Sequence, residues 1–561
     1  MNRNYAVNET TFMYDFRSMV DNMAEKFTTR TALSYKENPS DDETVRKSYL
    51  QLREDVRGLG TSLISKGLKD SRIALIGENS YGWACTYYAV MAIGAVLVPI
   101  DKELPEEDIK GIIEFAECSA VVYGKSSAGK VENIKPGLAG VKHFFSIAED
   151  LPEMFTEGAA MYAAGDRSYY SFKIDPEKPG SIVFTSGTTG KGKGVMLSQK
   201  NILMDMTLGE YNFSVSDRTL FVLPPHHTFG STVIYVGHVP QGCNVFISSG
   251  LKHISEEMQS QHPVSLILVP AFLEMMHKKI WEAARKSGRE GLLKGMIDVS
   301  NFLLKLGIDV RKPLFRSVRA AFGGSLETVI CGGAKLDDTI IRTFTALGIT
   351  VMNGYGITEC SPLISCNRNR YQKPGSVGIP IILQDVRILN PDEDGDGEIC
   401  VKGPNVMLGY YRNPEATAEA FTEDGYFRTG DFGHLDEEGW IYITGRLKNL
   451  IILSNGKNVY PEEIEAEIQK VPGVGEVVVY SGKSEKRNCK DLIVAEIYPN
   501  QEELDSLHIA DMQAYFDAEI ARINSRMPSF KAVKMVRLRE TEFKKNTSRK
   551  IVRFAIDKNI D

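Results

Sequence analysis

Residues 181–197 combine backbone and side chains that are suited to holding phosphate. The segment reads Ser-Ile-Val-Phe-Thr-Ser-Gly-Thr-Thr-Gly-Lys-Gly-Lys-Gly-Val-Met-Leu. Its glycines let the backbone turn sharply and approach a ligand, while hydroxyls and ammonium groups can bind phosphate oxygens. The pattern predicts a triphosphate site, with a Gly/Ser/Thr surface linker as the alternative. The hydroxyls belong to Thr185, Ser186, Thr188 and Thr189, and the ammonium groups to Lys191 and Lys193.

The same segment almost matches the Walker A loop. Residues 187–193 have the spacing G-x-x-x-x-G-K, but Gly194 stands where that loop carries the Ser or Thr that holds magnesium. This difference argues against a kinase-like or GTPase-like P-loop. If the chain uses ATP, another part of it has to bind the metal.

A second candidate site lies at residues 353–362, Asn-Gly-Tyr-Gly-Ile-Thr-Glu-Cys-Ser-Pro. Tyr355 can stack on a base, Thr358 can hydrogen-bond a phosphate, and Glu359 can bind magnesium. A simple strand-to-helix turn is the alternative interpretation. Further along, Thr-Gly-Asp431 ends in a carboxylate that can accept two hydrogen bonds from ribose hydroxyls.

Short apolar strands alternate with helical stretches from about residue 50 to residue 360, and these elements must position the first two sites. The alternation predicts parallel sheets covered by helices. After residue 375, short strands with tight glycine turns predict a small antiparallel β subdomain. The parallel strands are expected at 72–76, 120–123, 181–184, 220–223, 265–269, 328–330 and 349–352.

The last segment predicts a compact α+β domain, with a strand at 450–453, a helix opened by Pro461, strands near 476–480 and 492–498, and a helix near 510–525. The expected fold class is therefore α/β plus α+β. A large N-terminal domain over 1–445 has two helix-covered, mostly parallel sheets and the antiparallel subdomain, and a mobile C-terminal domain covers 446–561. Residues 278–312 are interpreted as a solvated, basic helix hairpin without a binding surface.

Composition narrows the class of protein further. The chain has 561 residues, of which 43% are hydrophobic and 25% charged, as in ordinary globular proteins with several domains. A net charge of -7 argues against nucleic acid as a partner. The amino terminus lacks the pattern of a secretion signal, and the longest apolar run, residues 87–100, is shorter than the ~20 residues of a membrane span. We therefore expect a cytoplasmic protein without a transmembrane segment, whose eight scattered cysteines are reduced thiols.

Together and in this order, the motifs resemble the adenylate-forming superfamily, which includes acyl-CoA synthetases, nonribosomal adenylation domains and beetle luciferases. The resemblance extends over nearly the whole chain. It is carried by residues 79–83, 94–99, 185–195, 223–230, 332–334, 353–362, 429–431, 445–448 and 455–465.

The resemblance implies a reaction in two steps. A carboxylate attacks the α-phosphate of ATP to give acyl-AMP and pyrophosphate, and a thiol then takes the acyl group. By the same resemblance Glu359 binds Mg²⁺, Thr358 contacts the α-phosphate, and Asp431 takes the ribose with Arg446 beside it. Gly333 and Tyr355 line the adenine slot. The implied nucleotide-binding residues are Thr185, Ser186, Gly187, Thr188, Thr189, Gly190 and Lys193, then Gly332, Gly333, Ala334, Asn353, Gly354, Tyr355 and Gly356, and finally Thr358, Asp431, Arg446 and Lys448.

The resemblance also implies a catalytic lysine near the carboxy terminus. The family places it before Ile-x-Arg, which Lys550-Ile-Val-Arg553 matches. Its ammonium would bridge the substrate carboxylate and the α-phosphate. Many relatives have Gly before this lysine where this chain has Arg549, and a solvated basic tail is the alternative. Lys448 falls at the hinge about which the small domain would rotate between the two steps.

Two further positions carry alternatives. His227 lies where the family has a His or an aromatic residue at the mouth of the acyl pocket, so it is a candidate catalytic residue. The alternative is that His226 and His227 only pack in, or cap, a strand-to-helix turn. Gly192 replaces the usual Pro before Lys193, which leaves the phosphate donors in place.

Several segments look like the long-chain fatty acyl-CoA synthetase branch, namely residues 269–274, the helical insertion around 278–318, residues 322–326 and residues 454–465. A medium- or long-chain fatty acid is thus the expected substrate, with ATP, Mg²⁺ and coenzyme A. Residues 227–235 lack the Asp that would pair with an amino-acid ammonium. An acyl carrier protein is the alternative acceptor, and a nucleotide-binding regulatory protein without turnover is the alternative of another class. Peripheral membrane contact stays open, although no amphipathic anchor is evident.

Overall fold

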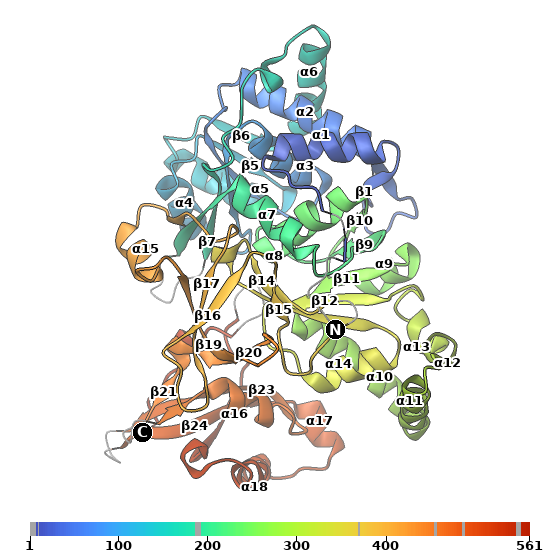
Figure 1. Cartoon of the computed structure of the whole chain (residues 1–561), viewed down its shortest axis with the longest axis vertical. Helices are drawn as coiled ribbons and strands as arrows, with labels where there is room; N and C mark the ends of the chain where they lie inside the picture. The colour runs from blue at the N-terminus through green and yellow to red at the C-terminus, as the bar shows by residue number, and fades with distance from the viewer. Residues whose placement is uncertain are drawn as a thin grey trace. The chain divides into compact units, whose positions relative to one another are not determined.

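The computed structural model describes residues 7–8, 10–185, 192–368, 371–453, 457–484, 489–545 and 551–560. The chain divides into two compact units, the first made of residues 1–385 and 401–427 and the second of residues 386–400 and 428–561. Both units mix helices with sheets, as the sequence predicts (Figure 1). The chain enters the small unit at residue 386, returns to the large unit for residues 401–427 and ends in the small unit. The boundary at residues 445 and 446 and the mobility of the small domain stay predictions.

The first unit contains a nine-stranded sheet whose central five pairings are parallel. Antiparallel strands close both of its edges. In spatial order its strands are β15 (Ile379–Pro380), β14 (Leu363–Cys366), β13 (Thr350–Gly356), β12 (Thr328–Gly332), β11 (Ser265–Leu268), β9 (Arg218–Phe221), β10 (Asn244–Ile247), β1 (Thr31–Tyr35) and β2 (Val45–Ser48).

A second sheet of the same unit has seven strands, with parallel pairing from β7 to β6 and an antiparallel edge. Its parallel strands are short, apolar and almost fully buried, which is typical of a sheet covered on both faces. In order they are β18 (Gly409–Tyr410), β8 (Lys193–Ser198), β7 (Pro179–Thr185), β4 (Val96–Ile100), β3 (Arg72–Ile76), β5 (Ala120–Tyr123) and β6 (His143–Ser146).

Two helices contact strands of both sheets and therefore lie between them. Helix α3 (Tyr81–Ala92) contacts β3, β4 and β1, and α7 (Gln199–Gly209) contacts β7, β8 and β14. Almost every residue of both helices is buried, as expected of helices enclosed on all sides. Ser198 fixes the start of α7, because its hydroxyl accepts the Asn201 N–H while the Asn201 side chain accepts the Ser198 N–H.

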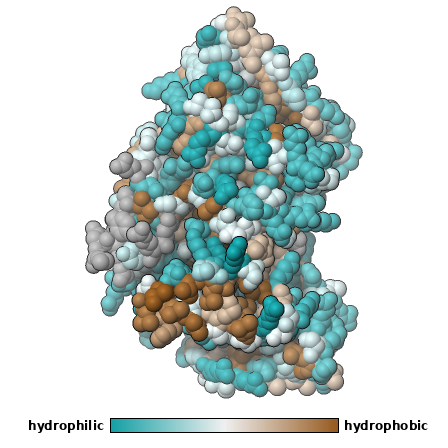
Figure 2. Space-filling model, turned by 90° about the vertical axis from the view of Figure 1, so that its right-hand side faces the viewer, coloured by the Kyte–Doolittle hydropathy of each residue, from teal (hydrophilic) through white to brown (hydrophobic). Residues whose placement is uncertain are grey.

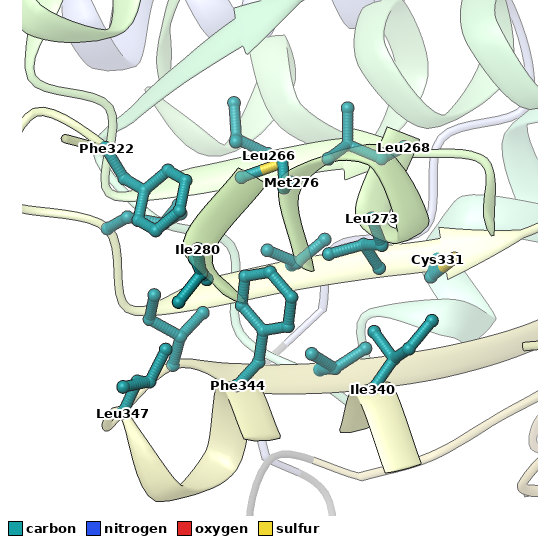
Figure 3. Packing of buried hydrophobic residues seen from close by; sticks show 14 of the residues in the cluster. Leu266, Leu268, Leu273, Met276, Ile280, Phe322, Cys331, Ile340, Phe344 and Leu347 are labelled. Carbon is teal, nitrogen blue, oxygen red and sulfur yellow. The ribbon is translucent and has the colours of Figure 1, made fainter. Parts of the chain in front are cut away.

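The outer face of the nine-stranded sheet is covered by α10 (Pro270–Lys286) and α14 (Asp338–Ala346) (Figure 3). Met276 and Ile280 of α10 and Phe344 of α14 point into a cluster of side chains from β11 and β12, which includes Leu266 and Cys331. These side chains have at most 8% of their surface exposed, so this cluster is one of the hydrophobic cores that fix the sheet.

The first unit has further helices besides these four. The helical insertion after β11 contains α11 (Glu290–Lys305), α12 (Arg311–Leu314) and α13 (Arg316–Ala320), as predicted for residues 278–318. The others are α1 (Phe16–Phe27), α2 (Tyr49–Ser65), α4 (Glu106–Phe115), α5 (Ala128–Ile134), α6 (Leu151–Ala163), α8 (Thr228–Ser231), α9 (Ile254–Gln261) and α15 (Pro414–Ala420).

The second unit contains the predicted antiparallel sheet, in the order β16 (Asp385–Leu389), β17 (Gly397–Lys402), β19 (Phe427–Leu435) and β20 (Ile441–Arg446). The glycine turns at 392–398 and 436–439 join neighbouring strands of it. The carboxy-terminal part has a sheet of β23 (Val474–Ser484), β24 (Cys489–Pro499) and β25 (Met535–Leu538), and a small ladder of β21 (Ile451–Ile452) and β22 (Asn458–Val459). Its helices are α16 (Pro461–Ile468), α17 (Gln501–Ser506) and α18 (Met512–Asn524).

Candidate active site

The strands that flank the predicted phosphate loop form an antiparallel hairpin. β7 pairs with β8 so that Thr185 lies opposite Lys193, and the Thr185 hydroxyl donates to the Lys193 carbonyl at 3.5 Å. The loop therefore leaves and re-enters the sheet at two of the predicted phosphate ligands. The other predicted ligands, Ser186, Gly187, Thr188, Thr189 and Gly190, lie outside the described residues.

Tyr410 connects this hairpin to the second predicted site. It lies on β18, opposite Val195 of β8, and its ring centroid is 4.6 Å from the Lys193 ammonium. The phenol donates a hydrogen bond of 2.9 Å to Oε1 of Glu359. Burial and then the charge of Glu359 raise the pKa of Tyr410, so the phenol keeps its proton and remains a donor. Tyr410 was not found from the sequence, where one tyrosine after a glycine gives no signal.

Glu359 lies in a short 3₁₀ turn, Thr358–Cys360, that follows directly after β13. The backbone N–H of Met407 donates to the Glu359 carbonyl at 2.8 Å. The side-chain amide of Asn405 donates to the carbonyls of Cys360 at 2.9 Å and Leu363 at 2.7 Å. The turn that carries Thr358 and Glu359 is thus held on both sides by the segment 405–407.

A buried carboxyl group completes this support. Oδ1 of Asp205, on α7, accepts from the Asn405 amide and from the Leu363 N–H, each at 2.9 Å. Burial raises the pKa of Asp205 well above its usual range, and the two hydrogen bonds oppose this only in part. Asp205 was also missed, yet a lone acid inside the apolar helical run Ile202-Leu-Met-Asp-Met206 was a usable signal.

Six of the predicted nucleotide-binding residues line one pocket of the first unit. The space in this pocket is about 590 Å³, a volume that includes open solvent at its mouth. The six are Gly332, Gly333, Asn353, Gly354, Tyr355 and Gly356, and the other walls are mostly apolar, formed by Met206, Phe213, Phe229, Val233, Ile330, Met352, Pro362, Leu363, Cys366 and Asn367. Ala334 is exposed and is not one of the lining residues.

Two of these glycines are needed for the local backbone. Gly333 has a φ of +90°, a conformation that side chains rarely tolerate. A Cβ on Gly356 would lie 2.0 Å from the Pro362 carbonyl oxygen, so the strand and the following turn can meet only at a glycine. The Asn353–Gly356 motif is therefore a strand that forms a wall of the pocket and leads into the Glu359 turn.

The two adjacent histidines have different surroundings. Nε2 of His226 lies 3.5 Å from Oδ2 of Asp101, and burial lowers the pKa of His226 to about 4, so this ring is neutral at pH 7. Its Nε2 has no hydrogen-bond partner in the described part of the chain. His227 is the N-cap residue of α8 without a side-chain capping bond, and its ring packs on that of His226 at 4.2 Å. His227 does not line the pocket, although Phe229, two residues later, does.

In the second unit, Asp431 and Arg446 face each other across β19 and β20. Nε of Arg446 lies 2.7 Å from Oδ1 of Asp431, whose side chain is only 3% exposed. The Asp431 N–H donates to the Thr429 hydroxyl, which in turn donates to the Ile399 carbonyl. The structure thus brings the predicted ribose carboxylate and its predicted neighbour together.

The remaining predicted residues lie nearer to the carboxy terminus. Lys448 is exposed in the short 3₁₀ turn Leu447–Asn449 that follows β20. Lys550 lies outside the described residues. Arg553, three positions later, forms an ion pair with Glu465 of α16 and donates to the Val479 carbonyl at 3.3 Å, which anchors the chain just after the predicted lysine.

Within the residues that the structure describes, no three His, Cys, Asp or Glu side chains come close enough to hold an ion by themselves. Magnesium is commonly bound by one or two carboxylates together with phosphate oxygens and water. Glu359, fixed beside the strand that re-enters from the phosphate loop, is compatible with that kind of site.

Comparison with known families assigns both parts of the chain. The AMP-binding enzyme family matches residues 20–411, and the AMP-binding enzyme C-terminal domain matches residues 448–560. The long-chain-fatty-acid–CoA ligase FadD15 of Mycobacterium bovis is 26% identical over 88% of this chain and 86% of its own length. The chloroplastic long-chain-fatty-acid–[acyl-carrier-protein] ligase AEE15 of Arabidopsis thaliana is 27% identical over 86% of this chain and 75% of its own length.

The fold is also that of solved adenylate-forming enzymes. The ATP-bound structure of MatB from Rhodopseudomonas palustris superimposes with a TM-score of 0.74 at 25% identity, covering 95% of this chain and 97% of MatB. The fold class and the resemblance found from the sequence are thereby confirmed. The chain belongs to the AMP-binding family of adenylate-forming enzymes, is similar to the fatty acyl-CoA synthetases within it, and is an acid–thiol ligase.

Proposed function

We propose that the protein is a long-chain fatty acid–CoA ligase that forms acyl-AMP from a medium- or long-chain fatty acid and ATP. The observation that carries this proposal is strand β13. Its residues Asn353–Gly356 form a wall of a mostly apolar pocket, and the strand leads directly into the turn of Thr358 and Glu359. Residues predicted to bind the nucleotide and apolar side chains line the same pocket, so an acid held against its apolar walls would present its carboxylate next to the groups that suit ATP.

In the first step the fatty acid carboxylate attacks the α-phosphate, and pyrophosphate leaves. Lys193 and the loop hydroxyls bind the β- and γ-phosphates, and Thr358 donates to the α-phosphate. Bound Mg²⁺, held by Glu359 and phosphate oxygens, would supply positive charge. Tyr410 keeps Glu359 in place and its ring faces Lys193, so both groups are held before the substrate binds. For His227 we keep the role that the family resemblance implies, at the mouth of the acyl pocket, although His227 is not one of the residues that line the pocket beside β13.

For the second unit we keep the roles that the family resemblance implies. Asp431 accepts the ribose hydroxyls, with Arg446 beside it, and Lys448 is the hinge of a domain over 446–561. Lys550 bridges the substrate carboxylate and the α-phosphate during adenylation. In the second step the thiol of coenzyme A attacks the acyl-AMP carbonyl, the acyl–sulfur bond forms and AMP leaves.

The test is incubation of the full chain with ATP, Mg²⁺ and fatty acids of graded length, with detection of acyl-AMP and pyrophosphate. Coenzyme A or a phosphopantetheinylated carrier protein is then supplied. We expect an adenylate with fatty acids and acyl transfer to coenzyme A. No adenylate with any fatty acid would contradict the proposal and favour a regulatory nucleotide-binding protein.

Two outcomes refine the proposal. If the acyl group is transferred to the carrier protein but not to coenzyme A, the acceptor is an acyl carrier protein, as in the name of the Arabidopsis relative. Lys550→Ala should abolish adenylation while ATP binding, measured by calorimetry, stays close to that of the wild type. Normal adenylation by this variant would show that Lys550 is not the catalytic lysine.

A further inference from the structure

The helical insertion after β11 carries a row of exposed hydrophobic side chains. On α11 they are Leu292, Val299 and Phe302, which are 59%, 55% and 62% exposed. Leu306 and Ile308, just after the helix, are 61% and 51% exposed. Figure 2, which shows this side of the molecule, has its largest hydrophobic area at the lower left, at the level of this insertion. We call these five residues the α11 stripe.

The stripe forms one face of a helix whose opposite face is already packed. Positions 292, 299, 302 and 306 follow the 3- and 4-residue spacing that places side chains on one side of a helix. On another side, Leu293 and Ser300 are buried, and Ile297 packs against the core of the first unit. The helix is therefore anchored to the protein, and its second apolar face is left to solvent.

The insertion that carries the stripe has an excess of positive charge, although several of its cations, such as Lys294 with Glu290, are paired with acids. Residues 278–316 contain ten Lys or Arg and four Asp or Glu, in a chain whose net charge is -7. Lys305 lies in the last turn of α11 and Arg289 is its N-cap residue, so a cation stands at each end of the helix. Both are exposed, and neither forms an ion pair within the described part of the chain.

We propose that the α11 stripe is a docking surface for a membrane with anionic lipids. A helix with Leu and Phe on one face and Lys and Arg beside it lies in the interface of a bilayer, with its apolar face among the acyl chains. The helix would lie in the plane of the surface. It cannot cross a bilayer, because every helix in the described ranges is too short or too polar for a span.

This proposal departs from the expectation that the insertion is only a solvated hairpin and that the chain has no amphipathic anchor. The basic character was visible in the sequence, but its apolar residues were compatible with burial. The structure shows that α11 has two apolar faces and that only one of them is used inside the protein.

A second copy of the chain fits this surface less well than a lipid bilayer does. A symmetric dimer would bring the same patch of each copy together. The excess of positive charge would then meet itself, and like charges across an interface oppose association. Anionic lipid offers the complementary charge and an apolar interior together.

The experiment is cosedimentation of the full chain with vesicles of phosphatidylcholine alone or with one third phosphatidylserine. We expect binding to the anionic vesicles that weakens as salt is raised. Phe302→Ser combined with Leu306→Ser should reduce binding at least tenfold, since both apolar side chains are lost from the bilayer. Arg289→Ser combined with Lys305→Ser should reduce it roughly 20-fold at physiological salt. Leu251→Ser, at an equally apolar side chain that is 49% exposed, is the matched control.

A second measurement keeps the test valid if the double variants fold poorly. Phe302→Trp places a fluorophore in the stripe, and brominated lipids should quench it more strongly than they quench Leu251→Trp. Equal quenching of the two, or vesicle binding that survives loss of the stripe residues, would overturn the proposal. So would sedimentation showing a concentration-dependent dimer that depends on Phe302 while vesicle binding is absent.

Discussion

The hydrogen bond between Tyr410 and Glu359 gives the sharpest test of the candidate active site. Tyr410→Phe removes only the hydroxyl that donates to Oε1 of Glu359 at 2.9 Å. The ring that faces Lys193 at 4.6 Å stays in place. The variant therefore removes the hydrogen bond that positions the Glu359 carboxylate and leaves the contact between the ring and Lys193 unchanged.

The magnitude follows from the type of bond. A buried hydrogen bond to a charged acceptor contributes about 1.5–3 kcal/mol. Tyr410 is 8% exposed, so water does not readily replace the lost hydroxyl. If Glu359 has to keep its place to bind the metal and triphosphate, kcat/KM for MgATP should fall roughly 10- to 150-fold.

The assay is fatty-acid-dependent exchange of pyrophosphate into ATP, which reports the first step alone. Tyr411→Phe is the matched control. Tyr411 packs on Phe115, with ring centroids 5.7 Å apart, and within the described part of the chain it has no hydrogen bond to Glu359 like the one that Tyr410 donates. A double-mutant cycle with Glu359→Ala, which removes the acceptor, measures the coupling directly. The effect of Tyr410→Phe should largely disappear in the Glu359→Ala background.

Wild-type exchange by Tyr410→Phe would refute this reasoning, since the hydroxyl would then not position a group that the reaction needs. Equal losses from Tyr410→Phe in both backgrounds would also refute it, because the hydroxyl would then act on something other than Glu359.

Three further predictions concern the support of the site and its pH dependence. Gly356→Ala should cost several kcal/mol of stability or prevent folding, because its Cβ would lie 2.0 Å from the Pro362 carbonyl oxygen. Gly354→Ala is the control and should be tolerated, because the nearest contact of its Cβ would be at 3.6 Å. Burial lowers the pKa of His238 to about 4, so below pH 6.5 the unfolded chain takes up a proton that the folded chain does not. The free energy of unfolding should therefore fall by about 3 kcal/mol between pH 6.5 and pH 4. His238→Asn should lack this loss. Burial raises the pKa of Asp205, so its contribution to stability is lost as pH rises above 4, and Asp205→Asn should be more stable than the wild type at pH 8.

Urea denaturation followed by circular dichroism across pH 4–8 checks all three. Equal stability of the two glycine variants would show that the turn after β13 can relax. Parallel pH profiles of the wild type and His238→Asn would mean that this ring is protonated in the folded chain as well. A loss of stability in Asp205→Asn at pH 8 would show that the carboxylate is ionised and that its charge strengthens the hydrogen bonds from Asn405 and Leu363.

Much of the architecture could be predicted because it depends on local pattern. The strands at 72–76 and 120–123 and the helix that starts at Pro461 have the predicted bounds or start, since apolar runs between turn signals and Pro at a helix start are local features. Strand β13 runs to Gly356, beyond the predicted 352, because pairing with β14 across the chain reversal extends it. That pairing depends on residues 363–366, which no local pattern includes.

The chemistry of the site could be predicted less completely than its residues. Glu359, Asp431 and Arg446 were found from motifs, and the structure pairs the last two. Tyr410, Asp205 and Asn405 could not be found together, because their contacts join positions far apart in the chain. The sequence also could not show which side of α11 packs against the protein, because apolar residues occur both in the α11 stripe and on its buried face.

The residues that hold the Glu359 turn in place are far apart in the sequence, and this affects the order in which they are translated. Asp205 and Asn405 are 200 residues apart, and Asn201 and Pro404, which are also hydrogen-bonded, are 203 apart. At about 5–20 residues per second, roughly 10–40 s pass between translation of the two partners. During that time the turn of Thr358 and Glu359 lacks the hydrogen bonds from Asn405 that hold it. Because the proposed first step also needs Lys550, a nascent chain should be unable to form acyl-AMP until residue 550 has left the ribosome.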